Sequence, residues 1–186
     1  MPTITEAKIL ILSTNGFEQS ELEVPRDKLR EAGATVHVAT PDGAAITGWD
    51  DKDWGREASA DVAIGDVTLA DYDAVVLPGG QINPDILRTN EEAVDLIRKA
   101  YNDGKTVAAI CHAPWLLVEA GVLKGRKATS YPSIRTDVEN AGAHWEDSEV
   151  VTDQGLITSR NPGDLDAFVS KIIEEIEEGT HERKAA

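Results

Sequence analysis

Short apolar runs alternate with helical patterns along this chain, and this alternation restricts the fold more than any other feature of the sequence. The runs read as short buried strands, and they lie at residues 8–13, 35–40, 73–77, 106–110 and 156–159. A parallel sheet covered by helices on both faces buries strands of this kind. The sequence therefore predicts an α/β fold. Reactive groups in such sheets gather at the carboxyl ends of the strands, where the candidate site is expected.

The expected helices lie between these strands and after the last one, at residues 20–32, 91–103, 115–120, 133–140 and 161–178. Ser20 and Glu23 resemble a capping box for the first helix, and Pro25 predicts a kink or a later start. An apolar stripe with helical period marks the last helix. Residues 44–70 read as irregular with short strand pieces, and residues 179–186 read as a frayed polar tail.

Length, charge and cysteine content restrict the class of protein. The 186 residues suit a single domain, 1–186, with its core at about residues 7–177. The formal net charge of −16 favours a surface that repels nucleic acid and anionic membranes. No signal peptide is visible, and no apolar run approaches the roughly 20 residues needed to span a bilayer. The single cysteine excludes an internal disulfide and predicts a cytoplasmic location.

That cysteine, Cys111, stands where the strand at 106–110 stops and a helical pattern begins. A sharp strand-to-helix turn projects one side chain above a sheet, and Ala109 and Ala113 supply the small neighbours that such a turn needs. Positive potential at the helix start predicts a thiolate, and therefore a nucleophile. The alternative is a buried structural cysteine, because free cysteine often behaves as a small hydrophobic residue.

Further groups accompany Cys111 in the predicted site. His112 is adjacent and either activates the sulfur or is a solvated histidine. Glu18 follows the first strand; its carboxyl can hydrogen-bond the sulfur and move a substrate proton, or it can be a charge near a helix start. Gly79 and Gly80 follow another strand, and their backbone amides can hold an oxyanion or form an ordinary turn.

No cofactor and no metal are predicted. The chain has one cysteine, and no cluster of cysteine and histidine has the spacing of metal ligands. The turn at residues 78–81 matches neither glycine-rich phosphate-binding pattern. Of the other histidines, His37 reads as packing within a strand, His144 as part of an edge-like segment and His181 as part of the tail.

Six segments, taken together and in order, resemble the DJ-1/PfpI superfamily, and within it the branch of PfpI-like intracellular proteases and general stress proteins. They include Val-Leu-Pro-Gly-Gly and Ala-Ile-Cys-His-Ala-Pro, and they lie at residues 15–22, 76–80, 109–114, 120–126, 129–132 and 158–165. The resemblance implies a flavodoxin-like three-layer sandwich. It also implies that Cys111 stands on a strained elbow, contacted by Glu18 and partnered by His112.

An assembly is implied by the same resemblance. In this branch a carboxylate from a neighbouring subunit completes a Cys-His-acid site, and the matching position here is Asp85. Dimers that can assemble into hexamers are typical of the branch, so a homodimer or hexamer is expected. Tyr131 matches a residue that lines the same pocket.

Chemistry on reactive carbonyls is the activity that we favour from this resemblance. A thiolate adds to an aldehyde as a hemithioacetal, and a nearby acid–base pair can move a proton between adjacent carbons without a cofactor. This predicts a glyoxalase or deglycase that acts on a small carbonyl or a glycated substrate. The alternatives are an intracellular cysteine peptidase and a non-enzymatic redox sensor or holdase, although no second cysteine is present to resolve a sulfenic acid.

Overall fold

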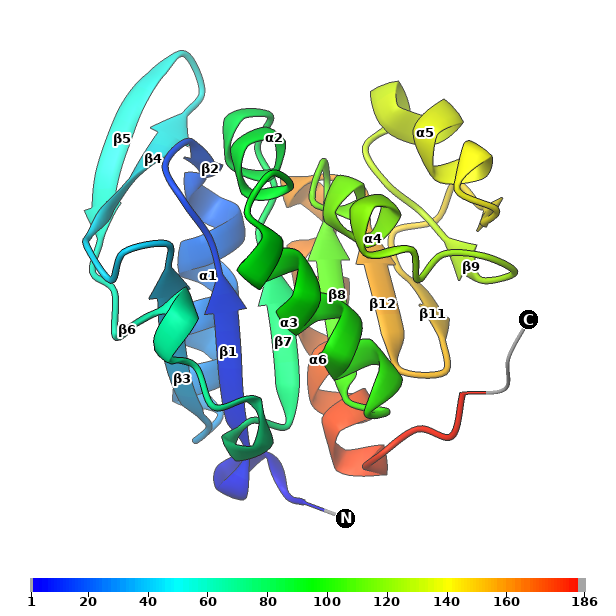
Figure 1. Ribbon diagram of the computed structural model, residues 1–186, viewed down its shortest axis with the longest axis horizontal. Helices are drawn as coiled ribbons and strands as arrows, with labels where there is room; N and C mark the ends of the chain where they lie inside the picture. Colours follow the sequence, from blue (N-terminus) through cyan, green and yellow to red (C-terminus); the bar gives the residue numbers. More distant parts are fainter. Residues whose placement is uncertain (1, 184–186) are drawn as a thin grey trace.

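Within residues 2–183, which the computed structural model describes, seven strands form one central sheet in the order β11-β12-β8-β7-β1-β3-β6 (Figure 1). The strands are β1 (Lys8–Leu12), β3 (Thr35–Thr40), β6 (Val62–Ala63), β7 (Ala74–Leu77), β8 (Thr106–Ile110), β11 (Val151–Asp153) and β12 (Leu156–Ser159). Every neighbouring pair is parallel except β11 and β12, which form an antiparallel hairpin. The predicted, mostly parallel sheet is confirmed.

Helices cover both faces of the sheet and make it the middle of three layers (Figure 1). The α-helices are α1 (Gln19–Glu31), α2 (Ile82–Leu87), α3 (Glu91–Asn102), α4 (Pro114–Ala120), α5 (Arg135–Asn140) and α6 (Leu165–Glu178). Short 3₁₀ helices occupy Ile4–Glu6, Ile64–Asp66, Leu69–Asp71, Pro132–Ile134 and Pro162–Asp164. Helices α1 and α6 pack together on one face, and α3 and α4 pack together on the other. This is the α/β sandwich that the sequence predicts.

Strand side chains alternate between the two helical layers. On β1, Ile9 and Ile11 join the buried cluster under α1 and α6, whereas Leu10 and Leu12 join the cluster under α3 and α4. All four side chains are fully buried. Because both faces of the sheet are covered, the ends of its strands are left to carry a site.

Helix α1 begins earlier than its sequence signals predict. Its N-cap residue is Glu18, with no side-chain cap, and Ser20 Oγ donates to Glu18 Oε1 at 3.5 Å, so the predicted capping box is wrong. The helix starts at Gln19 and continues through Pro25. Proline has no N–H, so the carbonyl of Glu21 loses its helical hydrogen bond. The helix starts early because Phe17 and Glu18 form a short strand, and the helix follows this strand without a connecting loop.

A second, smaller sheet organises much of the region from 44 to 70. It consists of β2 (Phe17–Glu18), β4 (Ile46–Asp50) and β5 (Asp53–Ala58), in the order β2-β4-β5. Glu18 pairs with Trp49 across β2 and β4, and the turn between β4 and β5 reaches past the carboxyl end of β1 (Figure 1). The expected strand pieces are therefore present, but they build a hairpin beside the candidate site. A parallel pair, β9 (Lys127–Ala128) and β10 (His144–Trp145), forms a separate two-stranded sheet, and β9 contacts β11 of the central sheet.

The C-terminal segment is docked as far as the structure describes it. The backbone N–H of His181 donates to Gly104 O at 2.8 Å, and Arg183 Nη2 donates to Lys105 O at 2.6 Å. The prediction of a frayed tail is wrong for residues 179–183, because long-range hydrogen bonds hold them. The last residues of that predicted tail, 184–186, lie outside the described residues.

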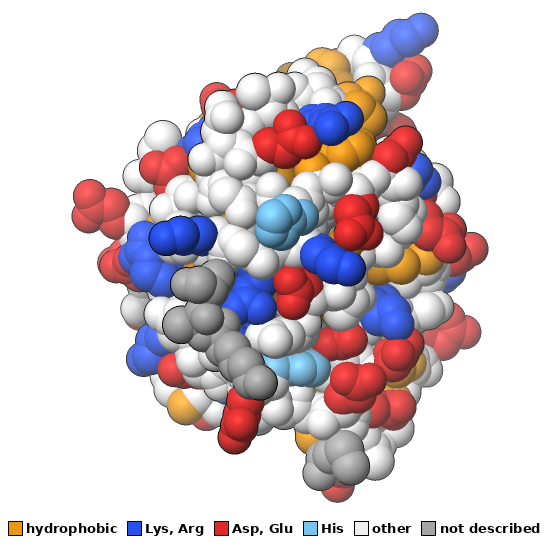
Figure 2. Space-filling view, turned by 90° about the vertical axis from the view of Figure 1, so that its right-hand side faces the viewer, with side chains coloured by type: hydrophobic (Ala, Val, Ile, Leu, Met, Phe, Trp, Pro, Cys, Tyr) orange, Lys and Arg blue, Asp and Glu red, His pale blue; other side chains and the backbone are white. Residues whose placement is uncertain are grey.

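Charged side chains of both signs are interspersed over the face shown in Figure 2, with no continuous basic area on that face. The acidic excess is therefore not matched by a basic patch there. Among the described residues, none of the helices combines the length and the apolar character that crossing a bilayer requires.

Candidate active site

Cys111 occupies a strained turn between β8 and α4. Its φ is +64°, a left-handed conformation that costs a non-glycine residue roughly 1–3 kcal/mol. Two backbone hydrogen bonds hold the turn: the N–H of Cys111 donates to Ser159 O at 3.0 Å, and the N–H of Tyr131 donates to Cys111 O at 2.8 Å. The predicted elbow geometry, a strand followed by the cysteine and a helix, is confirmed.

The sulfur lies within reach of an imidazole and a carboxyl group. Cys111 Sγ is 3.1 Å from His112 Nδ1, and the buried carboxyl of Glu21, on α1, lies beside the sulfur and acts on the pKa of its thiol. The backbone N–H of Gly80 donates to the sulfur as well. The Cys111 residue is only 6% exposed. The acid on the sulfur is therefore Glu21, and the expectation that Glu18 makes this contact is wrong.

Glu21 reaches the sulfur because of its place on α1. Leu22, Pro25 and Leu29 are buried on this helix, and Glu21 precedes Pro25 by four residues and Leu29 by eight. Residues at this spacing share one side of a helix. Helical periodicity was thus the signal in the sequence for a buried acid at this position.

Gly79 and Gly80, the two glycines after β7, were expected to hold a substrate oxyanion with their backbone amides, but their amides are directed elsewhere. The N–H of Gly79 donates to Glu21 Oε2 at 2.8 Å, so it orients the acid and is not free to hold a substrate oxyanion. The N–H of Gly80 is directed at the sulfur. A Cβ at position 79 would stand 2.4 Å from the Glu21 oxygen and 2.7 Å from Cys111 Cβ, so only glycine fits there. Of the two predicted oxyanion donors, one is already occupied by the acid.

Burial decides the protonation of the sulfur and its acid. The pKa of Glu21 is raised to about 8, first by burial and then by the charge of Glu18. Burial also raises the pKa of the Cys111 thiol, with the charge of Glu21 as the second cause. Burial, the first cause for both groups, therefore favours a protonated carboxyl and a neutral thiol and opposes the predicted resting thiolate.

His112 is held between aromatic rings. Its ring stacks on that of Tyr131, with centroids 4.7 Å apart, and meets Trp115 edge-on at 5.2 Å. Its Nε2 lies 3.2 Å from Ser133 Oγ, and burial lowers the pKa of the imidazole. A neutral ring that donates its Nε2–H to Ser133 leaves Nδ1 free to accept the thiol proton. The sequence placed Ser133 only at the start of a helix, and it carried no signal for the contact between Ser133 and His112.

A cavity of about 420 Å³ opens above the sulfur. Its lining residues are Gly16, Glu18, Glu21, Trp49, Asp51, Gly80, Gln81, Ile82, Cys111, His112, Tyr131 and Pro162. Glu18 thus belongs to the wall of the cavity, although it is not the partner of the sulfur. Tyr131 lines the cavity too, as the resemblance implies, and it is 40% exposed.

Two predicted site residues, Gly79 and Asp85, do not line this cavity. Asp85 is exposed in α2. A role for Asp85 in this chemistry would therefore need a second copy of the chain.

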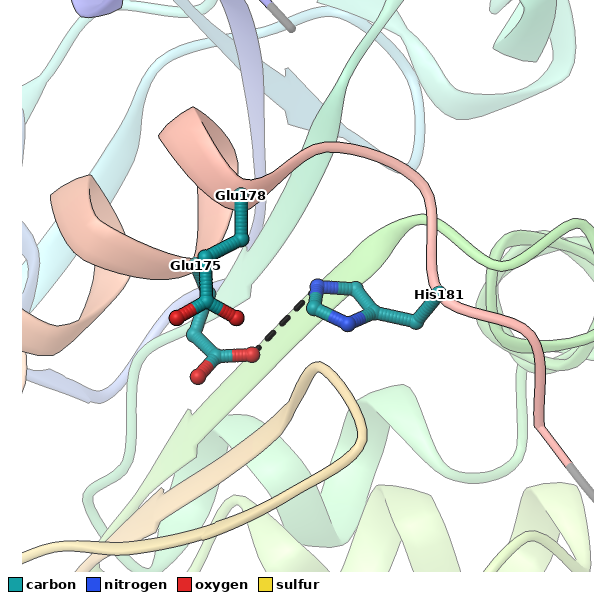
Figure 3. Close-up of side chains that lie close together, drawn as sticks. All are labelled: Glu175, Glu178 and His181. Atoms are coloured by element: carbon teal, nitrogen blue, oxygen red, sulfur yellow. Dashed lines mark ion pairs between the residues drawn. The ribbon is translucent and has the colours of Figure 1, made fainter.

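A group of ionisable side chains with metal-ligand character lies near the C-terminal end of α6 (Figure 3). Among residues 2–183, Glu175, Glu178 and His181 bring their ligand atoms within 4.8 Å of one another. His181 Nε2 lies 3.3 Å from Glu175 Oε2. The group shares no residue with the Cys111 cavity, and its contact joins α6 to the docked tail.

Glu21 is expected to make the protein less stable as the pH rises. Its folded pKa of about 8 lies above the ordinary value of 4.5, so its contribution is complete below pH 4.5 and is lost as the pH rises towards 8. Glu21→Gln removes this titration. The variant should therefore gain free energy of unfolding relative to the wild type, by up to about 1.4 kcal/mol per pH unit between pH 5 and 8. Urea unfolding at several pH values measures the difference, and parallel pH curves would contradict a buried neutral acid.

Comparison with known proteins identifies the family of this chain. The sequence matches the DJ-1/PfpI family over residues 7–175. It is 48% identical to Deglycase TK1284 of Thermococcus kodakarensis over 89% of this chain and 97% of the relative, and 44% identical to Protein/nucleic acid deglycase 2 of Escherichia coli over 87% and 92%. The crystal structure of Drosophila melanogaster DJ-1beta is similar with a TM-score of 0.81 at 34% identity, covering 92% of this chain and 94% of that one. By sequence and by fold, the chain belongs to the DJ-1/PfpI family.

Proposed function

We propose that this protein is a cysteine-dependent enzyme that removes early adducts of reactive dicarbonyls, such as methylglyoxal, from amino and thiol groups. The observation that carries the proposal is one sulfur that contacts both an imidazole and a protonated carboxyl beneath a cavity of about 420 Å³. The names of the relatives, which are deglycases, support it. The lone cysteine fits a reducing compartment, so we place the activity in the cytoplasm.

The first step exchanges the modified group for the sulfur. In an amine adduct, the carbon that bears the hydroxyl group also carries the nitrogen, and the ketone stands next to it. Cys111 Sγ bonds to this carbon as the carbon–nitrogen bond breaks. The thiol proton passes to His112 Nδ1, 3.1 Å away, and then to the leaving amine. The products of this step are the free amine and a hemithioacetal on the enzyme.

The second step moves hydrogen between the two adjacent carbons. His112 takes the proton from the carbon bonded to sulfur, while the protonated carboxyl of Glu21 supplies a proton to the neighbouring carbonyl oxygen. His112 then returns its proton to the second carbon, and Glu21 takes back a proton from the hydroxyl group next to sulfur. The result is a thioester of a 2-hydroxy acid. Water hydrolyses it, which releases lactate from a methylglyoxal adduct and restores the thiol.

The experiment that tests this function follows both products. An N-acetyl-lysine adduct of methylglyoxal is incubated with the enzyme, and free amine and lactate are measured together with the spontaneous dissociation of the adduct. Loss of the adduct faster than spontaneous dissociation supports direct deglycation. Lactate formed only at the spontaneous rate indicates a glyoxalase that consumes free aldehyde. If no lactate forms while peptides are cleaved in a Cys111-dependent reaction, the protein is a peptidase, and neither a deglycase nor a glyoxalase.

Burial supports an enzyme over a redox sensor. Peroxide reacts with thiolates, and sensing cysteines are exposed and have a low pKa. Here the Cys111 residue is 6% exposed, and burial raises the pKa of its thiol. A thiol that loses its proton only when substrate is attacked suits catalysis better than sensing.

We further propose that Asp85 acts across a homodimer interface, within an assembly that can extend to a hexamer. Asp85 is exposed on α2, and its neighbour Ile86 is 48% exposed, which suits a contact surface. Asp85→Asn should lower kcat/KM by roughly 10²-fold, the low end of general acid–base effects. Mixing it with Cys111→Ala should restore part of the activity, because the mixed dimer has one complete site. Light scattering measures the oligomeric state. A fully active monomer would contradict this arrangement.

A further inference from the structure

The cavity above Cys111 is bordered by acidic side chains and by no lysine or arginine. Glu18 and Asp51 line its wall, and Glu21 lies at its floor beside the sulfur. Among the described residues that line it, none is a lysine or an arginine. The charged side chains that a ligand meets on the wall of this cavity are therefore the acids Glu18 and Asp51.

Two separate segments bring the acids of the wall together. Glu18 ends β2, and the pairing of Glu18 with Trp49 aligns it with the end of β4, where Asp50 and Asp51 follow. The charges of Asp50 and Asp51 act on Glu18 strongly enough to raise its pKa, after burial as the first cause. Asp51 has a φ of +57°, which fixes the turn of the β4–β5 hairpin in an uncommon conformation. The negative charges of Glu18, Asp50 and Asp51 therefore act together at the mouth of the cavity.

Two cations near these acids do not line the cavity. Arg56 Nη2 pairs with Glu23 Oε2 at 2.6 Å, and its charge also acts on Asp50. Lys52 is exposed in the turn next to Asp51 and does not line the cavity. Since neither Arg56 nor Lys52 lines the cavity, a cationic ligand can pair with Glu18 and Asp51 there.

Aromatic rings line the same space and favour the same charge. Trp49 lines the cavity, and its Nε1 donates to Asp51 O at 3.0 Å, which ties its ring to the acidic turn. Tyr131 lines the cavity as well. The faces of such rings attract ammonium and guanidinium groups.

We propose that the cavity selects adducts that carry a positive charge next to the modified carbon, and that Glu18 and Asp51 determine this selectivity. Adducts of guanidinium- or ammonium-bearing groups would then be preferred over neutral adducts, and neutral adducts over anionic ones such as those of nucleotides. This specificity rests on the proposed function for its substrates, but the charge preference of the cavity exists whether or not the chemistry is deglycation.

The first test uses hemithioacetals of methylglyoxal that differ only in charge. Thiocholine gives a cationic adduct, 2-mercaptoethanol a neutral one and 3-mercaptopropionate an anionic one. We expect kcat/KM to fall in that order, by roughly tenfold at each step, and the differences to shrink at high salt, where charges are screened. Equal turnover of the three adducts would overturn the selectivity and leave the proposed function standing.

The second test does not depend on turnover. Cys111 is the only cysteine, so labelling of the protein by methanethiosulfonate reagents reports on this cavity alone. The trimethylammonium-ethyl reagent should label faster than the sulfonato-ethyl reagent, after each rate is divided by that with free 2-mercaptoethanol. Cation-selective labelling without turnover of any adduct would contradict the proposed function and support the charge selectivity of the cavity. Labelling without charge preference would overturn the selectivity.

Matched variants assign the effect to the two acids. Glu18→Gln and Asp51→Asn should each reduce the ratio of cationic to anionic labelling by several-fold. Glu57→Gln removes the same charge from an exposed position of β5 outside the cavity. It controls for the net charge of the protein, and its ratio should match the wild type. If Glu57→Gln reduces the ratio as much as the other two variants, the preference belongs to the whole surface and the assignment fails.

Discussion

Cys111→Ala is expected to lower the turnover of methylglyoxal adducts by at least about 10³-fold. The alanine methyl group cannot bond to the adduct carbon, and the chain has no second cysteine that could replace the sulfur. The amine or thiol then leaves only at its spontaneous rate. Steady-state release of lactate measures the loss. Mass spectrometry of acid-quenched wild-type enzyme should in addition find the hydroxyacyl group on Cys111.

Cys111→Ser is the matched control for this result. It keeps the size of the side chain and its hydrogen bonds but replaces the thiol by a weaker nucleophile, so it should also be inactive. Both variants should remain folded, because each changes one small side chain in a turn held by backbone bonds to Ser159 and Tyr131. Thermal unfolding checks this. Wild-type turnover in either variant would contradict a covalent mechanism.

Glu21→Gln is expected to lower kcat by about 10²- to 10⁴-fold, the usual range for a group that moves protons in the rate-limiting step. The amide is close in shape to the protonated carboxyl, and its oxygen can still accept the hydrogen bond from Gly79 N–H. It can therefore preserve the position of the side chain and still fail to exchange a proton with the substrate. Lactate release from the neutral 2-mercaptoethanol adduct is the suitable measurement, since it removes the effect of substrate charge.

Glu18→Gln provides the comparison that separates the two acids. Glu18 lines the cavity, but the carboxyl that lies beside the sulfur is that of Glu21. With the neutral adduct, Glu18→Gln should therefore lose less than about tenfold, far less than Glu21→Gln. A larger loss in Glu18→Gln would identify Glu18, the residue that the sequence suggested, as the catalytic acid. Equal losses would show that the two carboxyl groups act as one unit.

The elements that could be predicted from the sequence are those with a local hydrophobic signal. Strands β1, β7, β8 and β12 are short aliphatic runs, and α6 carries its apolar residues at helical spacing. Elements with weak local signals were missed. Helix α2 has only six residues and includes a proline, and the β4–β5 hairpin depends on pairing with β2, a segment about 30 residues away.

The candidate acid shows why a site cannot be completed from spacing alone. Glu18 and Glu21 are three residues apart, and both stand close to the start of α1. Which of them faces Cys111 depends on how Leu22 and Leu29 pack against the sheet, and that packing is a long-range contact. The same holds for Ser133, whose contact with His112 spans 21 positions of the sequence.

The sequence by itself determined the parallel α/β architecture and the elbow with its cysteine and histidine, because hydrophobic periodicity and adjacency along the chain are local properties. Only the tertiary structure decided that Glu21 is the acid beside the sulfur, that burial opposes a resting thiolate, and that an acidic hairpin borders the cavity. These three features depend on burial and on contacts between distant segments, since desolvation sets the pKa values and packing sets which side chains meet.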